Sequence, residues 1–99
     1  MNEAVLMIIT APNIEELMID LLLEQLDISG FTSHIVNAHG AGAIELSMQE
    51  QVSGRQQKVQ FMVYGTQSAL QAFIGLIKAK LEHSGTRYIL LPAIDSGVI

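Results

Sequence analysis

The stretch KVQFMVYGTQSALQAFIGLIKAKLEHSGTRYILL, residues 58–91, decides the fold of this chain. Lys58 to Tyr64 alternates polar and apolar side chains, which is typical of a strand with one buried face. Apolar residues then recur at helical spacing, at Leu70, Phe73, Ile74, Ile77 and Leu81. Ser84-Gly85 is expected to cap this helix, and Arg87 to Leu91 predicts a further strand that Pro92 stops. The stretch therefore predicts a strand, a helix and a strand.

The first half of the chain has the same order. Ala4 to Ile9 is apolar on both faces, as expected of a strand in the middle of a sheet. Asn13 followed by Glu16 predicts a capping box at the start of a helix whose apolar stripe continues to Leu26. Ser29-Gly30 is expected to end this helix, with the glycine in the left-handed conformation. Phe31 to Ala38 then predicts another strand.

The repeated order predicts the fold class. A constant shift aligns Met7 with Met62 and Ser29-Gly30 with Ser84-Gly85. Two strand–helix–strand units with right-handed crossovers give a four-stranded antiparallel sheet in the order 4-1-3-2, with both helices on one face. We expect an α+β, ferredoxin-like βαββαβ sandwich that forms a single domain over residues 1–99. The other sheet face is uncovered in this fold, and its candidate apolar residues, depending on register, are Leu6, Ile8, Met62 and Tyr64.

Composition narrows the functional classes. Of the 99 residues, 49% are hydrophobic and 15% are charged, which is a large apolar load for one small domain. We expect part of that surface to lie at a subunit interface. Five basic and ten acidic residues give a net charge of −5, which argues against nucleic acid as a partner. The N-terminus lacks a signal peptide pattern and no stretch predicts direct membrane insertion, so we expect a cytoplasmic protein.

Known catalytic motifs are missing from the sequence. It has no phosphate-loop motif, no nucleophile elbow and no His-Glu-x-x-His pair, and it has no cysteine for thiolate chemistry. We therefore expect no enzymatic activity and no catalytic residue. The alternative in this class is a dimeric ferredoxin-like enzyme of the cofactor-free monooxygenase type, which would enclose a pocket between sheet and helices.

His34 and His39 are the candidate metal ligands. Their separation of five residues would point them to opposite sides of a regular strand, so they could converge only at a bend near Gly40 or between subunits. A site that uses His34 or His39 with Met48 or a carboxylate could bind Cu or Zn. The second hypothesis is therefore a metal-binding (Cu/Zn) tolerance protein. His83, by contrast, has a structural reason to lie at a helix C-terminus, where a cation complements the helix dipole.

The chain resembles proteins of the PII-like superfamily. The expected architecture matches over nearly the whole chain, and the glycine turns with their flanking residues match in two specific places. Gly30 to Val36, followed by Gly40, resembles the second strand of PII proteins and the glycine that opens their T-loop. Lys58 to Tyr64, the following helix and Gly85-Thr86-Arg87 resemble their third strand, second helix and the B-loop with its phosphate-contacting basic residue. The short chain is similar to a bacterial branch encoded beside heavy-metal efflux pumps, and the CutA metal-tolerance branch is adjacent.

The resemblance implies a non-enzymatic signalling protein. It would form a homotrimer, sense a small ligand in the clefts between subunits and regulate a protein partner such as a heavy-metal transporter. The T-loop would be shortened to residues 41–57. The implied ligand-binding residues are Thr32, Gly40, Gly42, Gly85, Thr86 and Arg87.

The resemblance implies no definite cofactor. The candidate ligands are a nucleotide and the metal ions Cu and Zn. The sequence differs from the family at two phosphate contacts. Ala41 and Gly42 stand where PII proteins have Arg and Gln, and Ala93 to Ile99 has no basic residue where they have an Arg-x-Arg segment.

Overall fold

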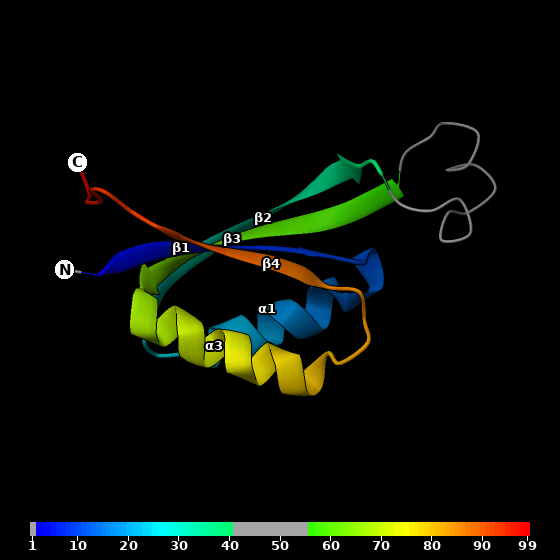
Figure 1. The fold of residues 1–99 in the computed structure, drawn as a ribbon, viewed down its shortest axis with the longest axis horizontal. Coiled ribbons are helices and arrows are strands. Elements are labelled where there is room, and N and C mark those ends of the chain that lie inside the picture. The colour runs from blue at the N-terminus through cyan, green and yellow to red at the C-terminus, as the bar shows by residue number, and fades with distance from the viewer. Residues whose placement is uncertain (1, 41–55) are drawn as a thin grey trace.

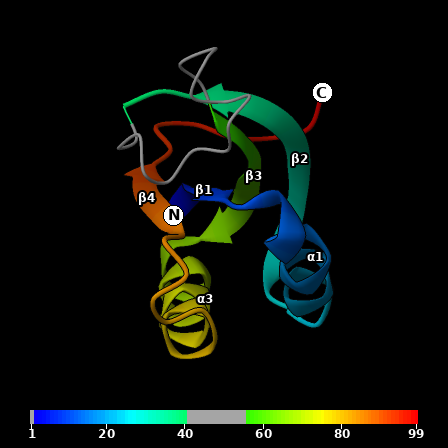
Figure 2. The ribbon, with the colours of Figure 1, turned by 90° about the vertical axis from the view of Figure 1, so that its right-hand side faces the viewer.

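The computed structural model describes residues 2–40 and 56–99. A four-stranded antiparallel sheet has the order β2-β3-β1-β4, and the two helices cover one face of it (Figures 1 and 2). The predicted fold class, strand order and one-sided helix layer are confirmed. The elements in chain order are β1 (Glu3–Thr10), the short 3-10 helix η1 (Pro12–Ile14), α1 (Glu15–Leu23), β2 (Ile28–Ala38), β3 (Gln56–Thr66), α3 (Gln67–Lys80) and β4 (Arg87–Pro92).

The two halves of the chain meet at the centre of the sheet. β1 and β3, the first strands of the two halves, are antiparallel neighbours, and Met7 and Met62 are Cα partners. β2 and β4, the second strands, form the two edges. Met7 and Met62, which the constant sequence shift aligns, thus lie side by side in the central strand pair, whereas Ser29-Gly30 lies in β2 and Ser84-Gly85 precedes β4.

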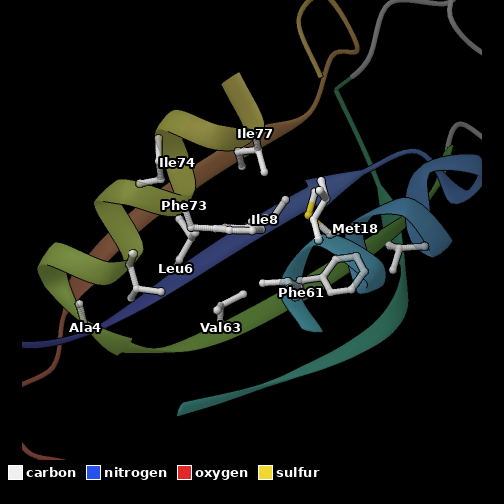
Figure 3. Packing of buried hydrophobic residues seen from close by; sticks show 13 residues of the cluster. Ala4, Leu6, Ile8, Met18, Phe61, Val63, Phe73, Ile74 and Ile77 are labelled. Atoms are coloured by element: carbon white, nitrogen blue, oxygen red, sulfur yellow. The ribbon is translucent and has the colours of Figure 1, made fainter. Parts of the chain in front are cut away.

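The register of β1 and β3 decides which residues form the core. Along β1 every second residue is buried, and Leu6 and Ile8 have no exposed surface because they face the helices. Their expected place on the uncovered face is therefore wrong, while Met62 and Tyr64 do lie on that face, opposite Met7 and Val5. The buried apolar cluster (Figure 3) comprises Ala4, Leu6, Ile8, Met18, Leu21, Leu22, Val59, Phe61, Val63, Leu70, Phe73, Ile74 and Ile77.

The ends of α1 differ from the prediction. Asn13 lies within η1, the N-cap of α1 is Ile14, and no side chain caps the helix, so the capping box is not formed. Glu15 and Glu16 in the first turn still complement the positive end of the helix dipole. The helix ends at Leu23, and Ser29-Gly30 belongs to β2 instead of a helix cap because this segment pairs with β3 across a register shift between Ile28 and Gly30.

The helix α3 follows its predicted stripe. Its N-cap is Thr66, whose side-chain oxygen accepts a hydrogen bond of 3.2 Å from the backbone N–H of Ala69. The C-cap is Leu81, and His83 at φ 63° lies in the left-handed region before Gly85 at φ 78° turns the chain into β4. Ser84-Gly85 therefore belongs to the turn that follows the helix, beyond its C-cap.

The strand β3 begins at Gln56, two residues before the predicted start. Residues 41–55 of the expected T-loop, Gly42 among them, lie outside the described residues. Within the described part of the chain, neither helix has the length and apolar character needed to cross a membrane.

Candidate functional site

The residues expected to bind a ligand lie on both edges of the sheet. Thr32 is on β2 and is the Cα partner of Met62, whereas Arg87 begins β4 and is the Cα partner of Ile9. β3 and β1 separate them, which at the usual strand spacing places their backbones about 14 Å apart. A single chain therefore does not bring Thr32 and Arg87 into one pocket.

The end of β2, which Gly40 follows in the sequence, and the turn before β4 lie at the same end of the sheet (Figure 1). Both Gly40, at φ 92°, and Gly85, at φ 78°, use left-handed backbone conformations, and a Cβ atom on either would meet no atom within 4 Å. At both glycines the left-handed conformation, and not a close neighbouring atom, is the reason for glycine. Gly42 falls outside the described residues.

The hydroxyl of Thr86 takes part in a hydrogen-bond network within the protein. Its Oγ1 lies 2.8 Å from Thr10 Oγ1, and it accepts a hydrogen bond of 2.8 Å from the Ser84 hydroxyl. The Thr86 backbone N–H donates in turn to Ser84 Oγ at 3.2 Å. Because Thr10 is buried against the helix layer, this network holds the turn onto the end of β1.

Arg87 extends on the uncovered face of the sheet. It is exposed and lines a shallow hollow of about 220 Å³ together with Met7, Ile9 and Ile89. Within residues 2–40 and 56–99, its guanidinium has no ion-pair or hydrogen-bond partner. The guanidinium of Arg87, which the sequence analysis identified as a candidate phosphate contact, is therefore available to a ligand or a partner.

The histidines do not converge. His34 is exposed on β2 opposite Gln60, and His39 is exposed beyond the end of that strand. Five residues of extended chain span about 16 Å. Within the described ranges no group of three or more His, Asp or Glu side chains could hold a metal ion. Met48, the other ligand considered, lies outside those ranges, and exposed His83 pairs only with Glu82, at 3.5 Å from Nε2 to Oε1.

The uncovered sheet face carries a continuous apolar surface, which we call the open face. The pairings place Val5, Met7 and Ile9 of β1 between neighbours from β3 and β4. None of these side chains faces the helices, because the alternate residues of each strand do. The open face consists of Val5, Met7, Ile9, Met62, Tyr64, Ile89 and Leu91.

A groove lies at the end of the open face remote from Arg87. The chain after β4 crosses the ends of β1 and β3 toward β2 (Figure 2), and this tail and the sheet enclose about 560 Å³. Its walls include Glu3, Tyr64, Asp95 and Ser96. The Oε2 atom of Glu3 is buried there without a hydrogen-bond partner.

Sequence reasoning missed this groove. Ala93 to Ile99 is a short tail of mixed polar and apolar residues, and its charge is small. A strand that buries Leu6 and Ile8 must present Glu3 and Val5 on the other face, but Ala4 to Ile9 is apolar on both faces, so the sequence carried no signal for this parity.

Comparisons with known proteins agree with this architecture. The family model described as "Protein of unknown function (DUF3240)" matches residues 1–99. A crystal structure of a DUF3240 family protein from Shewanella baltica has a TM-score of 0.81 at 18% identity and covers 100% of this chain and 98% of its own. Among curated proteins, none matches this chain.

Two further structures extend the likeness to other families. A protein from Thermus thermophilus, described as PII-like and signaling, has a TM-score of 0.64 at 13% identity, with 94% of this chain and 91% of that chain covered. The divalent ion tolerance protein CutA1 from Ehrlichia chaffeensis has a TM-score of 0.73 at 13% identity, with 97% and 85% covered. At these identities the likeness establishes the shared fold.

Proposed function

Because this chain belongs to the DUF3240 family and has the fold of PII-like and CutA proteins, we propose that it is a non-enzymatic regulatory protein. The fold suggests signalling or divalent-ion tolerance. In our proposal the protein assembles as a homotrimer in the cytoplasm, senses a small ligand in clefts between subunits and regulates a partner such as a heavy-metal transporter.

Two observations carry the proposal. The open face is apolar and uncovered, and the expected ligand-binding residues lie on opposite edges of the sheet. Met7 and Met62 at its centre face away from the helices, and Ile89 is 55% exposed, so the face gains free energy when a second surface removes it from water. Thr32 and Arg87 lie on opposite edges of the sheet. Association of several copies through the open face supplies a cover for it and brings edges of different subunits together.

The charged residues near the open face limit the net charge that a bound ligand can carry. Arg87 is the basic residue of the implied site, whereas the groove at the other end presents Glu3 and Asp95. A cleft that combined these ends would hold one cation against two carboxylates, which disfavours a polyphosphate. We therefore expect a ligand with at most one anionic group, in place of ATP bound in the manner of PII proteins.

The test combines sedimentation of the purified protein with a thermal-shift panel of ATP, ADP, cyclic nucleotides, bicarbonate, Cu, Zn, Co and Ni. A ligand that binds only the folded state stabilises it by about 2.7 kcal/mol at 100 times its dissociation constant. A trimer that is stabilised by a ligand with at most one anionic group supports the proposal. A monomer at micromolar concentration contradicts it.

In our proposal the shortened T-loop, residues 41–57, passes the ligand-bound state to the partner, and a deletion within it tests this role. Residues 49–55 stand between β2 and β3 in the sequence, so their deletion removes no residue of either strand. We expect the variant to keep its oligomeric state and to lose binding to a co-purified transporter. Unchanged partner binding would show that residues 49–55 of the expected T-loop do not contact the partner.

The second candidate function is divalent-metal tolerance, which the likeness to CutA1 favours. The H34A/H39A variant should then lose stoichiometric Cu or Zn binding in calorimetry. Because His34 and His39 are about 16 Å apart along one chain, such a site would need ligands from two subunits. Metal binding that survives both substitutions would dismiss these residues as ligands.

A further inference from the structure

Two opposite charges without partners lie at the two ends of the open face. Glu3 begins β1, and its Oε2 is buried without a hydrogen-bond partner in the groove beneath the tail. Arg87 lies opposite Ile9, six residues further along β1, and its guanidinium is unpaired within the described parts of the chain. The separation along the strand is about 20 Å, so the two groups of one chain cannot meet.

A buried carboxylate oxygen without a partner is costly, and proteins usually satisfy such a group. The groove offers no internal cation, because its described lining contains a second carboxylate, Asp95, and the hydroxyl residues Ser29, Tyr64 and Ser96, but no Lys, Arg or His. A guanidinium from outside would satisfy Glu3 and match Asp95 in charge.

The open face joins the two charges by a continuous apolar surface. From the groove, Val5 leads through Met7 to Ile9, which lines the hollow shared with Arg87. A neighbouring copy that covers part of this surface carries the same two ends. A head-to-tail arrangement therefore places the basic end of one copy on the acidic end of the next.

We propose that the groove at Glu3 is completed by Arg87 of a neighbouring copy of this chain. The arginine side chain enters between the sheet and the tail and pairs with Glu3, with Asp95 as the second carboxylate of the groove. This proposal rests on the proposed assembly through the open face and adds the polar contact that sets the direction of association. In a closed ring every Glu3 receives one Arg87 and no groove is left empty.

A charge-exchange experiment tests the pairing. The wild type, E3R, R87E and the double variant E3R/R87E are compared by sedimentation at several concentrations, with circular dichroism to verify folding. The matched controls are E24R and K80E, which make the same changes of net charge at exposed positions on or beside the helices. Each single variant should weaken assembly at least about tenfold, because it removes one member of a desolvated pair, and the double variant should restore most of the loss.

Cross-linking keeps the pairing testable if a charge reversal disturbs folding. The chain has no cysteine, so E3C and R87C chains can be co-expressed and treated with a short bismaleimide. Cross-links between the two different chains support the proposal, and their absence in an assembled sample overturns it.

The outcomes separate this inference from the proposed function. If the wild type is monomeric, the proposed assembly fails and the pairing fails with it. If the wild type is assembled and the single variants behave like E24R and K80E, only the pairing is overturned. Single variants that weaken assembly without rescue in E3R/R87E also overturn the pairing, because a general effect of charge would explain them.

Discussion

Gly85 holds a backbone conformation that other residues adopt only at a cost. Its φ is 78°, and a Cβ atom built there would touch nothing within 4 Å, so the restriction comes from the backbone alone. We expect Gly85→Ala to lower the free energy of unfolding by about 1 to 2 kcal/mol. The measurement is urea denaturation beside Gly30→Ala, where space is equally open and no left-handed φ is required. Equal effects of the two substitutions would contradict this account.

Thr86 shows how one hydroxyl can serve the fold at a position where a family resemblance implies ligand contact. Thr86→Val would leave the buried hydroxyl of Thr10 without its partner at 2.8 Å. We expect a loss of about 1 to 3 kcal/mol in the free energy of unfolding, whereas Thr86→Ser should retain most of the stability because its hydroxyl remains. Thermal or urea unfolding checks both, and an unchanged stability of Thr86→Val would contradict a structural role for this hydroxyl.

The helix α3 contains one residue that stabilises it and one that weakens it. Thr66 caps the N-terminus through Ala69, while Gly75 lies exposed in the helix interior. Thr66 therefore contributes to the helix, and Gly75 weakens it without a packing reason within 4 Å.

Loss of the cap is expected to destabilise the protein. Thr66→Ala removes the oxygen that accepts from the Ala69 N–H, and we expect a loss of about 1 kcal/mol in the free energy of unfolding. Thr66→Ser is the control, because it keeps an accepting hydroxyl. A Thr66→Ala protein as stable as the wild type would show that water replaces the cap.

A substitution in the middle of the same helix is expected to raise the free energy of unfolding. Gly75→Ala restricts the unfolded chain and meets no neighbouring atom, so the free energy of unfolding should rise by about 0.5 to 1 kcal/mol. The midpoint of urea denaturation measures the change. A decrease would mean that the exposed side of α3 contacts another surface in the assembled protein.

The expected elements were largely correct where a periodic pattern was long. The stripe of α3 places Leu70, Phe73 and Ile77 in the core as predicted, because a helix shows its buried face in its spacing. The capping box at Asn13 failed because η1 precedes α1, and Ser29-Gly30 failed because pairing with β3 extends β2 backward. Local signals for helix ends thus yielded to strand pairing and to the turn before α1.

The whole molecule is a two-layer domain with one face of its sheet left open. The helices and Phe61 fill one side (Figure 3), while Met7 and Met62 lie at the centre of the other. Part of the apolar excess expected at a subunit interface therefore has a definite place in the fold.

A lysine on this face should prevent assembly without unfolding the subunit. Ile89→Lys introduces a charge into the open face at a residue that is 55% exposed in the single chain. Burial of that charge against a second copy is unfavourable, so sedimentation should show a smaller species with unchanged circular dichroism. Leu23→Lys is the control, because Leu23 is 68% exposed on α1, away from the open face. If both variants assemble like the wild type, the open face is not the interface.

The sequence by itself determined the order of strands and helices, and hence the fold class, because alternation and helical spacing are local properties of the chain. It also identified Arg87 as the basic residue beside a glycine turn. The parity of Ala4 to Ile9 could not be decided from a run that is apolar on both faces, and only packing against α1 and α3 made Leu6 internal and Met7 external. The tertiary structure alone placed Glu3 beneath the tail, with its Oε2 atom buried, and placed Arg87 at the far end of the same face, because both positions depend on pairings between distant parts of the chain.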